Sequence, residues 1–194
     1  MLQEKYMSKI ILLRHGKPDV PRHEKMKSND IHEWIKLYNI SGIEQACKPS
    51  LKALEISKEC NAVVCSDLPR SIESAKALEI EEIKIIDSLF REMGLPYGKV
   101  PFLKLRPEIW AVLFRVLWLL GYSANSESIK ESKIRAKKAA NMLKELAASN
   151  KSVLFVGHGF TNRFIAKELL SSGWEGPNSP GKSYWEFGVY QNAT

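Results

Sequence analysis

Short apolar runs recur along the chain, and longer stretches of mixed character separate them. Four runs, at residues 10–13, 62–65, 83–86 and 153–156, have the length and the β-branched content of buried strands. Residues 184–190 alternate between apolar and polar side chains, which predicts an edge strand. We therefore expect a sheet whose strands come from widely separated parts of the chain.

The stretches between these runs have the character of helices. Strands that alternate with helices indicate βαβ units and a mostly parallel sheet, and right-handed crossovers place helices on both of its faces. The predicted fold class is therefore α/β: a three-layer α/β/α sandwich around a mostly parallel central sheet, with a helical lid insertion. The helices are expected at residues 29–38, 42–58 with a bend or boundary near Pro49, 66–78 opened by a cap residue and a proline, 108–120, 128–148 and 161–171.

One segment, residues 91–126, departs from this alternation because several prolines precede its aromatic-rich helix. Trp110 and Trp118 lie on one face of that helix, which is more typical of core or cap packing than of a ligand site. Contact with a leaving group, or with a partner, stays an alternative. We predict a single domain over residues 1–194 with a lid-like insertion at about residues 94–126.

Charge and composition narrow the class of protein. A chain of 194 residues can bury a substantial core, and its 44% hydrophobic and 26% charged residues are typical of a globular domain. The net charge of +7 favours anionic ligands. Nucleic acid is one such ligand, but the basic residues are spread along the chain, so we expect no nucleic-acid partner.

The cysteines and the apolar segments indicate the compartment. Cys47, Cys60 and Cys65 are odd in number and lack C-x-x-C spacing, so neither a disulfide framework nor a zinc site is predicted. Residues 1–9 are polar and unlike a signal peptide, and residues 109–120 are too few to span a bilayer. We expect a cytoplasmic protein without a membrane partner.

Two of the predicted strands end on a histidine beside glycine. Residues 10–13 run into Arg14-His15-Gly16, and residues 153–156 run into Gly157-His158-Gly159. Open α/β sheets bind their ligands at the carboxyl ends of parallel strands, so both histidines are expected at one edge of the sheet.

The other two strands should bring further charged groups to the same edge. Arg70 lies in the first turn after the second strand, and Arg91 and Glu92 follow the third. A guanidinium presents a planar fork that matches phosphate oxygens, and helix N-termini add backbone N–H groups and a positive dipole. The pattern predicts a site for a dianionic phosphoryl group, with Gly159 at the start of one such helix.

Over nearly its whole length the chain resembles the histidine phosphatase superfamily, also called phosphoglycerate mutase-like. Each motif is weak alone, but their shared order and predicted context make the resemblance specific. The motifs that carry it are Leu13-Arg14-His15-Gly16, Gly42-Ile43-Glu44-Gln45-Ala46, residues 65–70 with Ser74-Ala75, Leu89-Phe90-Arg91-Glu92, Ser126-Glu127-Ser128 with Arg135, and Val156-Gly157-His158-Gly159.

The resemblance implies a role for each of these residues. His15 attacks phosphorus and becomes phosphohistidine, while Arg14, Arg70 and His158 hold the phosphoryl oxygens. Glu92 protonates the leaving oxygen and then activates water. The family uses neither metal nor cofactor, so we expect none here.

The chain departs from the family pattern in two places. Lys17-Pro18-Asp19 replaces the usual polar pair after Arg-His-Gly, which makes Lys17 a candidate substrate-binding cation at the pocket mouth. The W-E-G pattern after the acid is absent, so Glu127 competes with Glu92 for the role of proton donor. His23 and His32 have no supporting spacing and are expected on the surface.

The function expected from this resemblance is a metal-independent phosphatase that acts on a small phosphorylated metabolite. A phosphoglycerate mutase-type phosphotransferase, a phosphohistidine-protein phosphatase and a non-catalytic phosphate-binding module are the alternatives. The chain is shorter than typical mutases and lacks their extended motif after Arg-His-Gly, which favours hydrolysis. Neither the physiological substrate nor the oligomeric state follows from the sequence.

Overall fold

The central sheet has five strands in the order β4-β3-β6-β1-β7. The structure, a computed structural model, describes residues 8–21 and 24–192. Four strands run parallel and β7 pairs antiparallel with β1, so the predicted mostly parallel sheet is confirmed. The strands are β1 (Ser8–Arg14), β3 (Ala62–Cys65), β4 (Ile85–Ile86), β6 (Ser152–Gly157) and β7 (Phe187–Asn192).

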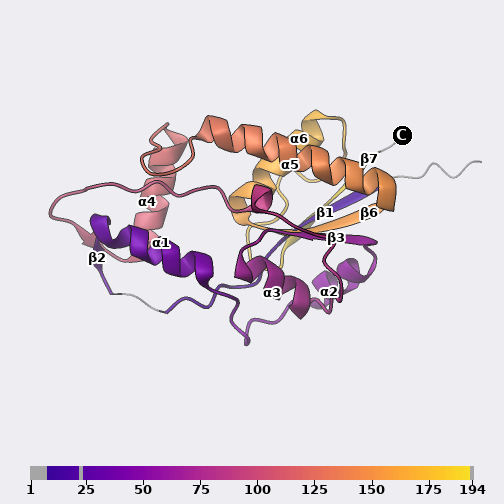
Figure 1. Cartoon of the computed structure of the whole chain (residues 1–194), viewed down its shortest axis with the longest axis horizontal. Helices are drawn as coiled ribbons and strands as arrows, with labels where there is room; N and C mark the ends of the chain where they lie inside the picture. Colours follow the sequence, from indigo (N-terminus) through magenta and orange to yellow (C-terminus); the bar gives the residue numbers. More distant parts are fainter. Residues whose placement is uncertain (1–7, 22–23, 193–194) are drawn as a thin grey trace, which may run out of the picture.

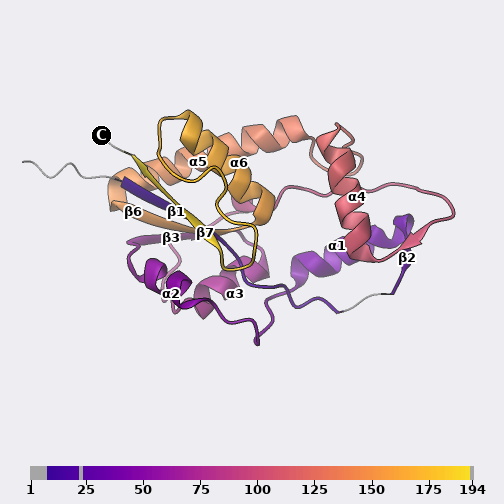
Figure 2. The ribbon, with the colours of Figure 1, turned by 180° about the vertical axis from the view of Figure 1, so that it is seen from behind.

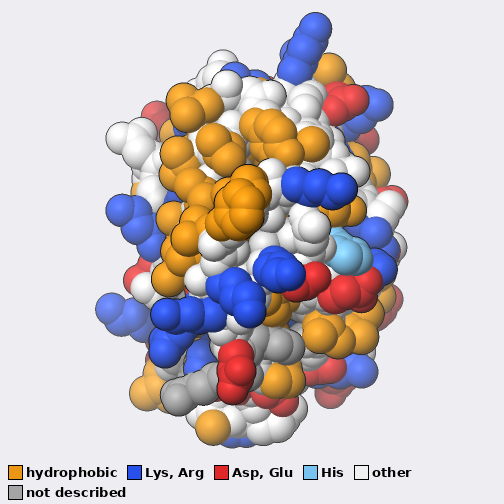
Figure 3. All heavy atoms as spheres, turned by 90° about the vertical axis from the view of Figure 1, so that its left-hand side faces the viewer, with side chains coloured by type: hydrophobic (Ala, Val, Ile, Leu, Met, Phe, Trp, Pro, Cys, Tyr) orange, Lys and Arg blue, Asp and Glu red, His pale blue; other side chains and the backbone are white. Residues whose placement is uncertain are grey.

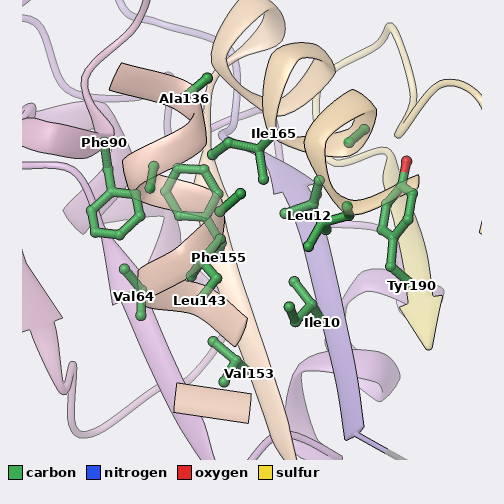
Figure 4. Packing of buried hydrophobic residues seen from close by; sticks show 14 of the residues in the cluster. Ile10, Leu12, Val64, Phe90, Ala136, Leu143, Val153, Phe155, Ile165 and Tyr190 are labelled. Carbon is green, nitrogen blue, oxygen red and sulfur yellow. The ribbon is translucent and has the colours of Figure 1, made fainter. Parts of the chain in front are cut away.

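Helices cover both faces of this sheet, which makes the three layers expected (Figure 1). Alternate residues of β1 point to opposite faces, so Ile10 and Leu12 pack with α5 and α6, whereas Ile11 and Leu13 pack on the other side. Figure 4 shows the first of these clusters, with Phe155 at its centre. The helices are α5 (Ile129–Asn150) and α6 (Gly159–Ser171) on one face and α2 (Leu51–Lys58) and α3 (Pro69–Ala77) on the other.

A separate group of elements lies beyond one end of the sheet, and we call it the cap (Figures 1 and 2). It has its own apolar cluster, in which Ile31 and Trp34 of α1 pack with Trp110 and Phe114 of α4. The cap consists of α1 (Ile31–Ile40), α4 (Pro107–Leu119), and the short antiparallel strands β2 (Met26–Lys27) and β5 (Lys104–Leu105). A 3-10 turn at Ser28–Asp30 leads into α1, and a second 3-10 turn, at Ser88–Phe90, follows β4.

Both tryptophans of the aromatic stripe are fully buried. The Trp110 indole donates a hydrogen bond to the Met26 carbonyl (2.9 Å), and the Trp118 indole donates to the Glu127 carbonyl (2.8 Å). Trp118 belongs to the sheet cluster rather than to the cap cluster. The stripe is therefore core, and neither tryptophan is free to contact a leaving group or a partner.

The predicted helix at residues 42–58 is wrong in its first half, because α2 begins only at Leu51. Residue Ser50 caps it by accepting a hydrogen bond from the Ala53 N–H (3.2 Å). Residues 42–50 make tertiary contacts instead of helical hydrogen bonds. The Ile43 N–H donates to the Glu73 carboxylate (2.9 Å), and Ile43 forms an antiparallel bridge with Pro18. These contacts compete with the helix, and Pro49 favours a break at the same place.

Two further boundaries differ from the prediction. The third strand is only two residues long, and the edge strand begins at Phe187 instead of residue 184 because Trp185 has a left-handed backbone (φ 65°). The β2–β5 pair was not predicted at all. Within residues 8–21 and 24–192, no helix is long and apolar enough to cross a membrane. Residues 1–7 and His23 lie outside the described part of the chain.

Candidate active site

The end of β1 brings Arg14 and His15 to the edge of the sheet. The His15 N–H donates to the Gly157 carbonyl (3.0 Å), so the pairing with β6 extends to the histidine itself. A Cβ on Gly16 would lie 2.4 Å from the Trp185 ring, which means that only glycine lets the chain pass there. The Gly16 N–H donates to the Ser74 hydroxyl (2.8 Å). These contacts fix the backbone of His15 and Gly16 against β6, α3 and Trp185.

The His15 imidazole is neutral and carries its lone pair on Nε2. Its Nδ1 lies 2.6 Å from the Gly16 carbonyl oxygen, which can only accept, so Nδ1 carries the proton. The ring is only 2% exposed. Burial, followed by the charges of His158 and Arg70, lowers the pKa of His15 well below its ordinary value. His15 is therefore an available nucleophile at neutral pH.

His158 follows β6 and meets His15 edge to face, with ring centroids 5.0 Å apart. Its Nε2 lies 2.7 Å from the Ser66 hydroxyl. The other recorded partner of that hydroxyl is a donor, the Leu68 N–H (3.4 Å), so within the described residues Nε2 is the acceptor for the hydroxyl hydrogen, and Nδ1 then carries the proton. Burial, then the charges of Arg70, Arg135 and Arg14, lower the pKa of His158.

Two arginines lie beside His15 and His158. Arg70 is 1% exposed; its guanidinium lies 4.7 Å from the Tyr38 ring centre and donates to the Tyr38 carbonyl (2.9 Å). Arg14 lies 4.5 Å from the Tyr184 ring centre and donates to the Lys182 carbonyl. Aromatic faces and carbonyls thus orient both cations. Sequence patterns gave no signal for Tyr38 or Tyr184, because their contribution depends on distant segments.

Three nitrogen atoms around these groups are buried without a hydrogen-bond partner: Arg14 Nε, Arg70 Nε and His158 Nδ1. A buried polar group left unpaired costs about 1–3 kcal/mol, so such a cluster indicates a ligand site. All three nitrogens are donors, and two belong to cations. A tetrahedral oxyanion offers the acceptors and the negative charge that match them.

Glu92 lies on the other side of the same space, at the N-terminus of α6. Its carboxylate accepts hydrogen bonds from the Phe160 N–H (3.1 Å), the Thr161 N–H (3.0 Å) and the Met93 N–H (2.9 Å). A Cβ on Gly159 would be 3.6 Å from both Glu92 Oε2 and Arg14 Nε. Gly159 therefore leaves room between the carboxylate and the arginine.

The protonation state of Glu92 follows from its surroundings. Burial raises the pKa of Glu92, but the charge of Arg115 and the N–H groups of Met93, Phe160 and Thr161 outweigh that effect and lower it overall. The carboxyl group is therefore ionised at neutral pH. A dianion bound beside it would raise its pKa again, because like charges disfavour ionisation.

The competing carboxylate, Glu127, has a structural environment. It accepts from the Arg135 guanidinium (3.0 Å) and the Gly94 N–H (2.9 Å). The same Arg135 donates to the Leu89 carbonyl (2.9 Å), and Arg115 donates to the Gly94 carbonyl (2.9 Å). Glu127 and the two arginines thus support the loop that carries Glu92.

Lys17 and His32 lie outside the cluster. The Lys17 ammonium is 2.7 Å from the Glu44 carboxylate, and that hydrogen bond raises the pKa of Lys17. The side chain is 51% exposed, so the ion pair lies at the surface and not among the buried donors. His32, on α1, contacts Glu33 (2.7 Å) and the Asn29 carbonyl (2.6 Å), and it shares no contact with His15.

A cavity of about 300 Å³ adjoins the cluster where Glu92 lies. The Asp67–Arg91 ion pair (2.6 Å) borders it. Among the described residues, no group of three or more His, Cys, Asp or Glu side chains is arranged to hold a metal ion. The lining residues are Asn39, Ile40, Asp67, Leu68, Pro69, Arg91 and Glu92.

Ser66 has a different place from the one predicted. It was expected to help open the helix after β3, but α3 starts at Pro69 without a side-chain cap. The serine hydroxyl contacts His158 instead. Only the three-dimensional neighbourhood of β3 and β6 makes this contact visible.

Comparison with known proteins gives one family and several solved structures with the same fold. The sequence profile described as "Histidine phosphatase superfamily (branch 1)" matches residues 10–184. No curated protein matches the chain in sequence.

Solved structures share the fold at low identity. Open reading frame Rv3214 from Mycobacterium tuberculosis is 18% identical (TM-score 0.63; 93% of this chain and 89% of that chain covered). A mycobacterial glucosyl-3-phosphoglycerate phosphatase is 20% identical (TM-score 0.55; 84% and 80%). A phosphoglycerate mutase from Bacillus anthracis str. Sterne is 18% identical (TM-score 0.57; 96% and 89%).

Proposed function

The chain belongs to the histidine phosphatase superfamily (branch 1), and on that premise we propose that it is a metal-independent phosphatase of small phosphomonoesters. The reaction passes through phosphohistidine at His15. One observation carries the proposal: a buried, neutral imidazole lies among three donors that have no partner, Arg14 Nε, Arg70 Nε and His158 Nδ1. This arrangement suits a phosphoryl group that is held for attack.

In the first step, the phosphoryl oxygens accept hydrogen bonds from Arg14, Arg70 and His158. The lone pair of His15 Nε2 forms a bond to phosphorus, and the bond from phosphorus to the leaving oxygen breaks. Glu92, protonated once the dianion has raised its pKa, gives its proton to that oxygen. The arginines stabilise the negative charge that moves through the transition state.

In the second step, water releases the phosphoryl group. The Glu92 carboxylate takes a proton from the water while the water oxygen bonds to phosphorus, and the bond from phosphorus to His15 Nε2 breaks. The electron pair returns to the imidazole, which is again neutral. Inorganic phosphate leaves, and Glu92 loses its proton to solvent.

The leaving group occupies the cavity beside Glu92 in this proposal. Its volume of about 300 Å³ suits a small metabolite better than a protein segment. Polar Asn39 and apolar Ile40 and Pro69 line it, so an alcohol with both hydroxyl and carbon surface fits its chemistry.

A mutase is the second candidate, because one of the solved structures that share this fold is that of a phosphoglycerate mutase. A mutase would pass the phosphoryl group from His15 to a second hydroxyl group instead of to water. Both reactions share the phosphohistidine, so they differ only in the product: free phosphate or an isomeric phosphate ester.

The test is chemical labelling. Enzyme incubated with a ³²P-labelled phosphate ester and quenched in alkali should carry label that survives base, is lost in acid and lies on His15. His15→Ala should lose the label and at least about 10⁴-fold in turnover, whereas the matched variant His32→Ala should keep both. Normal turnover by His15→Ala, or label on another residue, would refute the nucleophile.

A further inference from the structure

Helix α4 has two apolar faces, and only one of them is buried. Trp110, Phe114 and Trp118 pack inward, whereas five aliphatic side chains on the other face are between 49% and 79% exposed. At about 100° per residue, the five lie within an arc of roughly 100°. They are Ile109, Val112, Val116, Leu119 and Leu120.

The segment ahead of α4 adds to this surface. Phe102 is fully exposed and Leu103 is 41% exposed. Figure 3 shows hydrophobic side chains gathered over this face of the molecule, with Lys and Arg side chains in a band below them. We call the five aliphatic residues with Phe102 and Leu103 the α4 surface. A patch of this kind on a folded domain indicates an interaction site.

Cations lie at the N-terminal end of the α4 surface. Lys99, Lys104 and Arg106 are exposed, and none of them forms an ion pair with another described residue. Lys27 stands directly opposite Lys104 in the β2–β5 pair. Like charges in directly opposed positions destabilise a pair of strands, so this strand pair favours an anionic neighbour.

We propose that the α4 surface binds the anionic face of a lipid membrane. An interfacial helix lays its apolar stripe at the headgroup boundary, and nearby lysines and arginines contact anionic headgroups. Phe102 and Leu103 enter the same boundary. The association is peripheral, so no segment has to cross the bilayer. It differs from the expectation of no membrane partner, which rested on the absence of a segment long enough to span one.

A second copy of the chain fits this surface less well. An antiparallel pairing of two α4 helices would bring the cationic end of one against the C-terminal end of the other. Residues 117–126 contain no acidic side chain, so the cations would find no complement there. An anionic bilayer matches both the apolar stripe and the charge.

The experiment is vesicle flotation at low salt with two compositions, phosphatidylcholine alone and phosphatidylcholine mixed with phosphatidylserine. The protein should bind the mixed vesicles at least about ten-fold more tightly, because each basic residue near an anionic surface contributes about five-fold. Raising the salt should release it, since the exposed charges are screened.

Two pairs of variants locate the binding surface. Ile109→Asp should reduce binding to the mixed vesicles about ten-fold or more, whereas Ile134→Asp, at an equally exposed position (51%) on α5, should not. Lys104→Glu should reduce binding similarly, and Lys133→Glu on α5 should have a smaller effect. Lys104→Glu also replaces the repulsion between Lys104 and Lys27 with an attraction. We therefore expect this variant to stay folded, so that weaker binding reports the lost cation.

Some outcomes would overturn the proposal. One is failure of the wild-type protein to bind either vesicle; another is equal binding by folded Ile109→Asp and Ile134→Asp. A dimer seen by light scattering, lost in Ile109→Asp and accompanied by no vesicle binding, would show that a second copy covers this surface instead. Circular dichroism and thermal unfolding of each variant establish that it is folded.

Discussion

The end of the sheet and the cap both bury large side chains, but they bury them in different ways. Arg70, at the end of the sheet, is 1% exposed and its Nε has no partner. Trp110, in the cap, is fully buried and its one polar atom is paired with the Met26 carbonyl. Three unpaired donors lie together at the sheet end, whereas in the cap the Trp110 indole is paired and only the Trp34 Nε1 is buried without a partner among the described residues.

This difference separates a binding site from a core. Burying a polar group without a partner costs free energy, and a fold tolerates several such groups together when a ligand returns that energy. A paired indole among aliphatic side chains costs little and adds stability. Substitutions among the unpaired donors at the sheet end should therefore change chemistry, and substitutions in the apolar cluster of the cap should change stability.

Of the substitutions that compare these two regions, Arg70→Met should have the largest effect. Removal of the guanidinium should lower kcat/KM for a phosphomonoester about 10³-fold, or roughly 4 kcal/mol of transition-state stabilisation. Arg163→Met, on α6 with its cation near the Phe160 ring, is the control and should change kcat/KM less than about three-fold. Equal losses in the two variants would mean that Arg70 has no special part in the reaction.

Trp110→Ala should have the opposite profile. The cavity it leaves in the cap should lower the free energy of unfolding by about 3 kcal/mol in urea titrations. The folded enzyme should keep kcat within about three-fold, since the indole contacts no member of the site. A kcat that falls 100-fold or more with little loss of stability would contradict the comparison and make the cap part of the catalytic machinery.

The third prediction concerns the pH dependence of stability, whose effect at any one pH step is gradual. Burial lowers the pKa of both His15 and His158 below that of the unfolded chain. Below about pH 6.5 the unfolded chain takes up protons that the folded protein does not, so stability present above this pH is lost as the pH falls. The slope reaches about 1.4 kcal/mol per pH unit for each histidine.

Urea unfolding between about pH 7.5 and pH 5 measures this slope. His158→Asn should make it shallower, because one of the two groups responsible is gone. If the wild-type slope is flat across this range, the two imidazoles titrate alike in the folded and unfolded chains, and the buried neutral pair is refuted.

Much of this arrangement could be predicted because it depends on neighbouring residues. A short apolar run predicts a buried strand wherever it lies, and the residue after a parallel strand reaches the carboxyl edge of the sheet. His15 and His158 follow that rule, and the structure places their rings 5.0 Å apart. The helical spacing of Trp110 and Trp118 likewise predicted their burial.

The rest depends on groups that meet only after folding. Residues 42–50 were expected to be helical, but the Glu73 carboxylate and Pro18 hold Ile43 in another conformation. The helix expected from residue 66 begins at Pro69 without a side-chain cap, and β6 places His158 beside the Ser66 hydroxyl. The exposed stripe of α4 could not be recognised, because the period of the helix marks its apolar positions without showing which of them another element covers.

By itself, the sequence determined the strands of the central sheet, most of the helices that cover it and the residues at the strand ends. The tertiary structure alone decided which donors remain unpaired, how Glu127 and Arg135 support the loop of Glu92, and which face of α4 meets solvent. The physical reason is the distance along the chain over which each property is set. Periodicity and strand ends depend only on residues that are close together in the sequence. Pairing, burial and pKa are properties of neighbours that the chain brings together from far apart.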